Sequence, residues 1–82
     1  MKATREKVYK IINKERDYQT NKWGPLQDEK TSLSDFICYI QGYATRSQII
    51  SQENNPDEVL NNMRIIATLA VAAMEKFGVR ER

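Results

Sequence analysis

The segment from position 65 to position 74 reads IIATLAVAAM, ten consecutive residues without a charge and with Thr68 as the single polar side chain. Successive residues of an α-helix are turned by about 100°, so this segment forms a helix that is apolar around its whole circumference and has to be covered on every side. The run is shorter than the ~18 residues that a membrane span needs, so lipid is not the expected cover. We therefore expect an all-α protein whose chains associate with one another.

The length of 82 residues predicts a single helical domain, residues 1–82. A domain of this size buries only about 60% of its unfolded surface, and association into a homo-oligomer, a dimer or higher, would bury more. The N-terminal residues contain no continuous apolar segment typical of a secretory signal, so we expect a cytoplasmic protein without a membrane partner. The lone Cys38 lies in an apolar helical pattern and is expected to be a buried thiol.

Capping signals predict the first two helices. Thr4 is placed to cap a helix that runs to about Thr20, and Gly24-Pro25 prevents its continuation. Ser32 and Asp35 form a capping-box pattern at the start of the second helix. The apolar spacing predicts an inner side for the first helix at Val8, Ile11, Ile12 and Tyr18. The same spacing predicts one for the second helix at Leu33, Phe36, Ile37, Ile40, Tyr43, Ala44, Ser47 and Ile50.

The third helix is predicted to begin at the Asn55 cap with Pro56 in its first turn, and to end at Gly78. The short connection before it makes helices two and three a long antiparallel hairpin, which we expect to assemble into an oligomeric bundle. The inner side of the hairpin is predicted at Val59, Leu60, Met63, Ile66, Ala67, Ala70, Val71, Met74 and Phe77. The residues left for another subunit are then Ile65, Leu69, Ala72 and Ala73.

The distribution of acids and the absence of histidine argue against catalysis. Magnesium-dependent phosphate hydrolysis needs several carboxylates at helical spacing, because hard cations take oxygen ligands. The second helix has no acid between Asp35 and Glu53, and the third has none between Glu58 and Glu75. Without histidine, Cys38 also lacks an activating base. We expect no catalytic residues, no metal site and no cofactor.

The remaining polar residues favour binding. Tyr39 and Tyr43 lie one helical turn apart, with Arg46 one turn beyond, and the outer side of the same helix is uncharged at Gln41, Thr45, Gln48, Ser51 and Gln52. Aromatic rings stack on nucleobases, and arginine or lysine binds phosphate with charge-assisted hydrogen bonds. The predicted ligand-binding residues are Arg16, Gln19, Lys22, Trp23, Tyr39, Tyr43 and Arg46.

Each of these residues has a structural alternative. A tryptophan beside Gly24-Pro25, such as Trp23, is more often an anchor of the loop on the core than a stacking platform, and Tyr43 lies on the predicted inner side. The two arginines, Arg16 and Arg46, have Glu15 and Asp35 as possible ion-pair partners. Gly42 in the middle of a helix costs about 1 kcal/mol relative to alanine and indicates that something packs closely there.

The segment ERDYQTNKWG, Glu15 to Gly24, resembles the opening of short phage and prophage proteins related to MazG-like all-α nucleotide pyrophosphohydrolases. The segment AVAAME, Ala70 to Glu75, is similar to the apolar end of the last core helix in that family. The matching motif positions are Glu15, Arg16, Gln19, Lys22, Trp23 and Gly24. The resemblance implies an oligomeric helical scaffold with pockets between helices.

The metal ligands of that family have no counterpart here. The EExxE set is replaced by Tyr39-Ile40-Gln41-Gly42-Tyr43, and Asn62 and Ile65 stand where ligands of the next helix are expected. The leading hypothesis is therefore a non-catalytic homo-oligomeric binder of a small nucleotide or nucleotide-derived signal. By analogy, a phage protein of this kind would sequester a defence signal in the host cytoplasm.

Two alternatives stay open. One is a protein-interaction adaptor that acts through the faces of helices two and three, and the other is a nucleotide pyrophosphohydrolase built on Asp28, Glu29, Asp57 and Glu58. Specific DNA binding is not expected, because the basic first helix is not followed by a recognisable turn and recognition helix.

Overall fold

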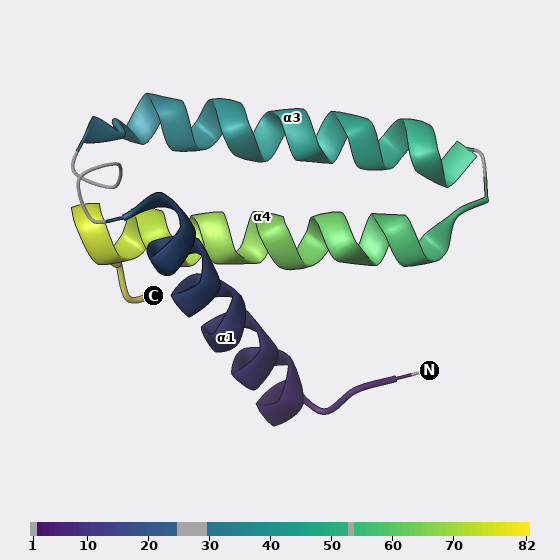
Figure 1. Ribbon diagram of the computed structural model, residues 1–82, viewed down its shortest axis with the longest axis horizontal. Helices are drawn as coiled ribbons and strands as arrows, with labels where there is room; N and C mark the ends of the chain where they lie inside the picture. The colour runs from purple at the N-terminus through teal and green to yellow at the C-terminus, as the bar shows by residue number, and fades with distance from the viewer. Residues whose placement is uncertain (1, 25–29, 53) are drawn as a thin grey trace.

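The computed structural model describes residues 2–24, 30–52 and 54–82, and the side chains of Trp23, Ser51 and Gln52 also lie outside the description. Over these residues the chain forms the helices α1 (Arg5–Trp23), α3 (Leu33–Gln52) and α4 (Pro56–Phe77), as Figure 1 shows. The expected all-α fold is confirmed, and so is the packing of α3 against α4 as an antiparallel pair. The expectations for Pro25, Asp28 and Glu29 lie outside the described residues.

Local capping fixes the helix starts as predicted. The Thr4 hydroxyl accepts a hydrogen bond from the Lys7 amide, and the Asn55 side chain accepts one from Glu58. In the reciprocal capping box, the Asp35 amide donates to Ser32 Oγ and the Ser32 amide donates to the Asp35 carboxylate. These side chains satisfy backbone donors that have no partner within the first helical turn.

The end of α1 differs slightly from the prediction. The helix continues past Thr20 to Trp23, and Gly24 follows it with φ of 78°. The Gly24 amide still donates to the carbonyl oxygen of Thr20, 2.8 Å away. Glycine reaches this positive φ without the Cβ penalty of other residues, so the helix ends at the glycine itself rather than one turn earlier.

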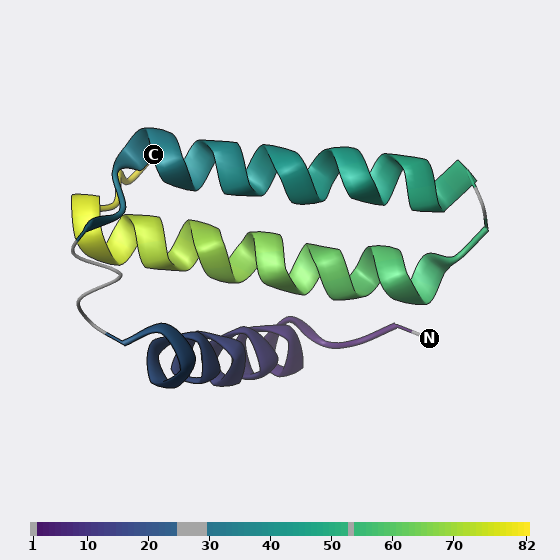
Figure 2. The ribbon, with the colours of Figure 1, turned by 45° about the horizontal axis from the view of Figure 1, so that its top comes forward.

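Helix α4 is the central element of the molecule. It contacts α3 along its length and also contacts α1, which crosses it obliquely. Figure 2 shows α3 and α1 on different sides of α4. The segment 65–73 is buried or half-buried between them, so part of the apolar circumference is covered within the chain.

Helix α1 packs on α4 through polar residues. Glu15 accepts from Arg64 Nε at 3.0 Å, and Arg16 Nε donates to Glu75 at 2.8 Å. The predicted inner side of α1 is wrong, because only Ile12 of that set is half-buried. The exposed fractions of the other three are 41% for Val8, 41% for Ile11 and 56% for Tyr18. The half-buried residues of α1 are therefore mostly polar: Glu15, Arg16, Gln19 and Thr20 beside Ile12.

On both helices of the hairpin, the predicted inner side included residues that the structure leaves exposed. On α3, Phe36 and Ser47 are buried and Ile40, Tyr43 and Ile50 half-buried, whereas Leu33, Ile37 and Ala44 are exposed. On α4, Leu60, Met63, Met74 and Phe77 are exposed rather than inside. The residues predicted to be left for another subunit, Ile65, Leu69, Ala72 and Ala73, are buried or half-buried by the chain's own helices. The helical period identifies the apolar faces, but it does not say which of them meets which neighbour.

The resulting core is small and partly polar. Among the described residues, the buried hydrophobic side chains are Phe36 and Ala72, accompanied by the buried polar residues Thr31, Ser47, Asn62 and Thr68. The hydroxyls of Ser47 and Thr68 donate to carbonyl oxygens one turn earlier in their own helices, which satisfies them without a partner helix. Within the described ranges, none of the helices combines the length and the apolar character needed to span a membrane.

Candidate ligand-binding site

The predicted site residues of α3 form one surface, which we call the α3 patch: Tyr39, Gly42, Tyr43 and Arg46. Their spacing of three and four residues places them along one flank of the helix. The Arg46 guanidinium carbon lies 5.1 Å from the centroid of the Tyr43 ring, a cation–π distance. Tyr39 is 49% exposed, whereas Tyr43 is half-buried. The patch therefore offers one free aromatic ring and one guanidinium that is held over a second ring.

Gly42 leaves the middle of the α3 patch bare. A Cβ atom built at this position would have no heavy atom within 4 Å. The expectation that something packs closely on Gly42 is therefore not met within the described part of the chain. The space above the helix backbone between Tyr39 and Arg46 is open to another molecule. The sequence pointed to Gly42 but did not identify it as part of the site.

The α3 patch and α1 lie on the same side of the hairpin. Helix α3 packs on α4 through Phe36 and Ser47, which are buried. At about 100° per residue, Tyr39 and Arg46 are rotated about 60° to 80° around the α3 axis from the direction of Phe36, toward one flank of the helix. Leu33 and Ile37 lie at a similar angle to the other flank. Because α3 is antiparallel to α4, the flank with Tyr39 and Arg46 faces the side on which α1 packs.

The outer side of α3 is uncharged and exposed at Gln41, Thr45 and Gln48, as the pattern indicated. Ser51 and Gln52 lie outside the described side chains. Cys38 is also exposed, so the expectation of a buried thiol was wrong. Cys38 follows Phe36 by two residues, about 200° around the helix, and therefore points away from α4 when Phe36 points toward it.

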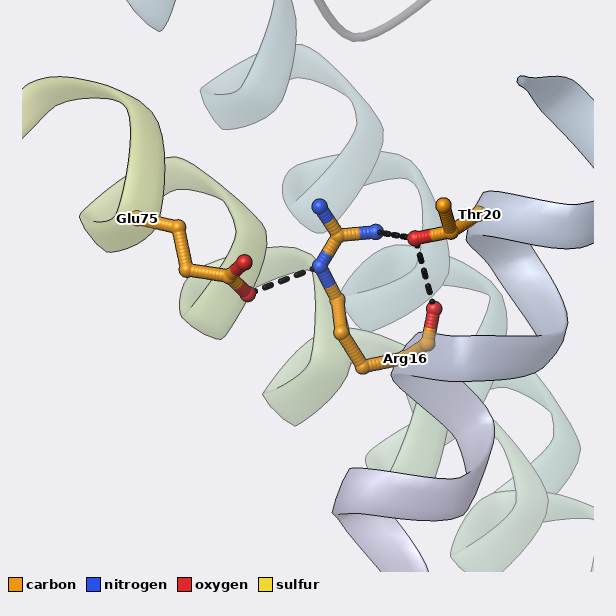
Figure 3. A network of polar contacts seen from close by, with 3 residues as sticks. All are labelled: Arg16, Thr20 and Glu75. Carbon is orange, nitrogen blue, oxygen red and sulfur yellow. Dashed lines mark hydrogen bonds and ion pairs between the residues drawn. The ribbon is translucent and has the colours of Figure 1, made fainter. Parts of the chain in front are cut away.

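Arg16 occupies a structural position between α1 and α4 (Figure 3). Its Nε donates to Glu75, and its Nη1 donates to Thr20 Oγ1 at 2.7 Å. The Thr20 hydroxyl in turn donates to the backbone carbonyl of Arg16 at 3.1 Å. The partner of Arg16 is thus Glu75 and not Glu15, which pairs with Arg64 instead. With its side chain 14% exposed, Arg16 fixes the crossing of the two helices.

The other predicted residues of α1 are placed near its end. Gln19 is half-buried, and Lys22 is exposed with its Nζ 5.8 Å from the centroid of the Tyr18 ring. The side chain of Trp23 lies outside the described residues. Among the predicted ligand-binding residues, the described contact between two of them is that of Arg46 with the Tyr43 ring. The convergence of the α1 residues with the α3 patch stays a prediction.

Several of the described acidic side chains serve caps and helix crossings. Asp35 has a pKa below its ordinary value, because its carboxylate accepts the Ser32 backbone and side-chain hydrogen bonds of the capping box, and Lys76 adds a favourable charge. Asp57 and Glu58 lie in the first turn of α4, next to the positive end of the helix dipole. Among the residues that the structure describes, there is no group of three cysteine or acidic side chains with the geometry to hold a metal ion.

Comparison with known proteins adds no functional assignment to the physical features described above. No protein-family model matches the chain, and no curated protein or solved structure is significantly similar to it.

Proposed function

We propose that the chain is a non-catalytic, homo-oligomeric binding protein for a small nucleotide or a nucleotide-derived signal. The observation that carries the proposal is the α3 patch, with bare helix backbone at Gly42 between the exposed ring of Tyr39 and the guanidinium of Arg46. A flat, open strip with an aromatic ring at one end and a cation at the other matches a ligand that is part planar base and part phosphate.

The chemistry of binding follows from these side chains. Stacking of a base on an aromatic ring contributes about 1 to 3 kcal/mol and requires one exposed ring face, which Tyr39 offers. Arg46 is already held over Tyr43, so less side-chain freedom is lost when its N–H groups donate to phosphate oxygens. Binding of this kind needs no carboxylates and no metal ion.

The resemblance of residues 15–24 and 70–75 to MazG-like phage proteins supports the nucleotide class and suggests the setting. In this proposal the protein acts in the host cytoplasm, where it binds a nucleotide signal of bacterial defence without turning it over. The missing EExxE acids favour sequestration over hydrolysis.

The adaptor alternative acts through the faces of α3 and α4 and has one observation in its favour. The outer side of α3 is exposed and uncharged at Gln41, Thr45 and Gln48. An adaptor of this kind would bind a partner protein on these faces and would not need a nucleotide on the α3 patch.

Calorimetry with ATP and with cyclic di-GMP tests the leading proposal. We expect at least one of the two probes to bind, to raise the melting temperature, and to be recovered chemically intact after denaturation of the protein. Arg46→Gln removes the phosphate contact, and Gly42→Leu fills the open strip without removing any contact, so both should abolish binding. Lys10→Gln, an equal loss of charge on exposed α1, is the matched control and should bind as the wild type does.

Failure of both probes to bind would count against the nucleotide class. Binding that survives both Arg46→Gln and Gly42→Leu would place the ligand elsewhere on the molecule. Release of pyrophosphate or of any cleaved product would refute the non-catalytic assignment.

A further inference from the structure

One side of α4 carries an apolar stripe whose large side chains α1 and α3 leave more than two-fifths exposed. At the end of the stripe the Phe77 ring also contacts the Phe36 ring of α3 edge to face, with the ring centroids 6.3 Å apart. We call this stripe the open face. Its spacing alternates between three and four residues, which is the pattern that helices use when they pack side by side at a shallow angle. The exposed fractions of its large members are 65% for Leu60, 53% for Met63, 44% for Met74 and 43% for Phe77. The open face consists of Leu60, Met63, Ala67, Ala70, Met74 and Phe77.

Helical geometry separates the open face from the two covered sides of α4. The side toward α3 is centred near Asn62, and the side toward α1 carries Arg64 and Glu75, which pair with α1. At about 100° per residue, the open face is centred about 120° from Asn62 and about 100° from Arg64 and Glu75. The three sides divide the circumference of α4 almost equally, and Figure 2 shows α1 and α3 on their two sides.

We propose that the open face is the contact with a second copy of this chain, with the two α4 helices antiparallel about a two-fold axis midway between Thr68 and Leu69. This proposal rests on the homo-oligomer of the proposed function and identifies its interface. The sequence of the stripe is symmetric about that midpoint in side-chain size. Leu60 meets Phe77 of the second copy, Met63 meets Met74, and Ala67 meets Ala70. A two-fold interface requires this kind of self-complementarity.

The small central pair sets the distance between the helices. Ala67 and Ala70 lie at the crossing point, where alanine allows helix axes to approach to about 8 Å. The larger pairs at either end then fill the space that opens as the helices diverge. The outer flank of α3 with Leu33 and Ile37, 51% and 58% exposed, lies on the same side of the hairpin and extends the apolar surface. The two hairpins thus face each other as a four-helix bundle.

The surface area of the single chain agrees with a missing partner. Its accessible surface is 6915 Å². A folded monomer of 9.6 kDa is expected to have about 5,100 Å², so the chain exposes about 1,800 Å² more than a self-sufficient domain does. A standard specific interface buries about 800 Å² on each partner. The excess is large enough to supply such an interface and leave further surface for a ligand.

The charges at the ends of α4 favour the antiparallel orientation. The first turn carries Asp57 and Glu58, whereas the last turn and the residues after it carry Lys76, Arg80 and Arg82 against Glu81 and Glu75, and the Glu75 carboxylate is already paired with Arg16 of α1. Antiparallel pairing puts the acidic turn of each copy beside the basic end of the other and also opposes the helix dipoles. Parallel pairing would bring like charges together at both ends.

A complementation experiment tests both the surface and its register. In the proposed dimer, Met63 of one copy meets Met74 of the other, so Met63→Glu or Met74→Lys alone places two unpaired charges in the interface. We expect each variant to raise the dimer dissociation constant about 100-fold, about tenfold for each buried charge. An equal mixture of the two variants restores one native methionine pair and forms one Glu–Lys pair, so the heterodimer should form again.

Sedimentation velocity and native mass spectrometry measure these species from about 1 μM to about 1 mM protein. Ile49→Glu, an equal change at an exposed position of α3, is the matched control and should leave the dimer intact. Circular dichroism verifies that every variant is helical. A wild-type chain that is monomeric throughout, a trimer, or a mixture that forms no heterodimer would overturn the proposal.

The readouts also separate this inference from the proposed ligand. If ATP and cyclic di-GMP do not bind while the dimer is intact, the proposed ligand is wrong and the proposed interface stands. Association that is insensitive to Met63→Glu and Met74→Lys rejects the open face alone.

Discussion

Replacement of Asn62 by leucine is expected to make the protein more stable. Asn62 is 4% exposed on the side of α4 that faces α3, and within the described part of the chain its Nδ2 atom has no hydrogen-bond partner. A buried donor without a partner costs about 1 to 3 kcal/mol. Leucine has almost the same length and branching, carries no donor, and is also the better helix former by a few tenths of a kcal/mol.

Together these terms predict a gain of about 2 kcal/mol in the free energy of unfolding for Asn62→Leu. For a domain of this size, 1 kcal/mol corresponds to about 4 to 8 °C, so the melting temperature should rise by about 10 °C. Urea and thermal unfolding followed by circular dichroism measure the change, at one fixed protein concentration because association adds to apparent stability.

Two further variants locate the origin of this gain. Asn13→Leu makes the same change at an exposed site of α1 and should shift the melting temperature by less than about 2 °C, since it changes only helix propensity. Asn62→Ala also removes the donor but leaves a cavity, and it should be less stable than Asn62→Leu. An Asn62→Leu protein that is no more stable than the wild type would show that the amide has a partner or that the site cannot accept an apolar side chain.

Two other predictions concern local features. Gly42→Ala should stabilise the protein by about 1 kcal/mol in urea unfolding, because the position is an open helix interior where a Cβ meets nothing, and a destabilised variant would refute that geometry. The depressed pKa of Asp35 should contribute stability above its unfolded value near 4, and this contribution is lost as the pH falls through the folded pKa. Unfolding of wild type and Asp35→Asn should therefore differ at neutral pH and converge in acid, and a constant difference would contradict the capping role.

The positions of the helices were predicted better than the contacts between them, because the side chains that cap a helix bind backbone groups close by in the sequence. Thr4, Ser32 with Asp35, and Asn55 each bind backbone groups within three residues, so their spacing alone identifies them. The exposed neutral side of α3 followed from the same kind of short-range pattern. The extension of α1 to Trp23 was missed by about one turn, because the rule for residues before proline keeps only Gly24 out of the helix and leaves the residues before it free to be helical.

The packing faces could not be predicted because they depend on contacts between distant residues. The pairs Glu15 with Arg64 and Arg16 with Glu75 join positions 49 and 59 residues apart, and no periodicity indicates them. They bring Glu15 and Arg16 against α4 and leave Val8 and Tyr18 41% and 56% exposed. For the candidate site, Tyr43 and Arg46 were predicted from helical spacing, whereas the open space over Gly42 required coordinates.

The attachment of α1 divides the molecule into two parts that respond differently to solvent. Electrostatic attraction between α1 and α4 is screened by dissolved ions, whereas the apolar contact between α3 and α4 is strengthened or unaffected by most salts. We therefore expect rising ionic strength to weaken the attachment of α1 before that of the hairpin, by an amount that is limited because the Arg16 and Glu15 side chains are only 14% and 18% exposed.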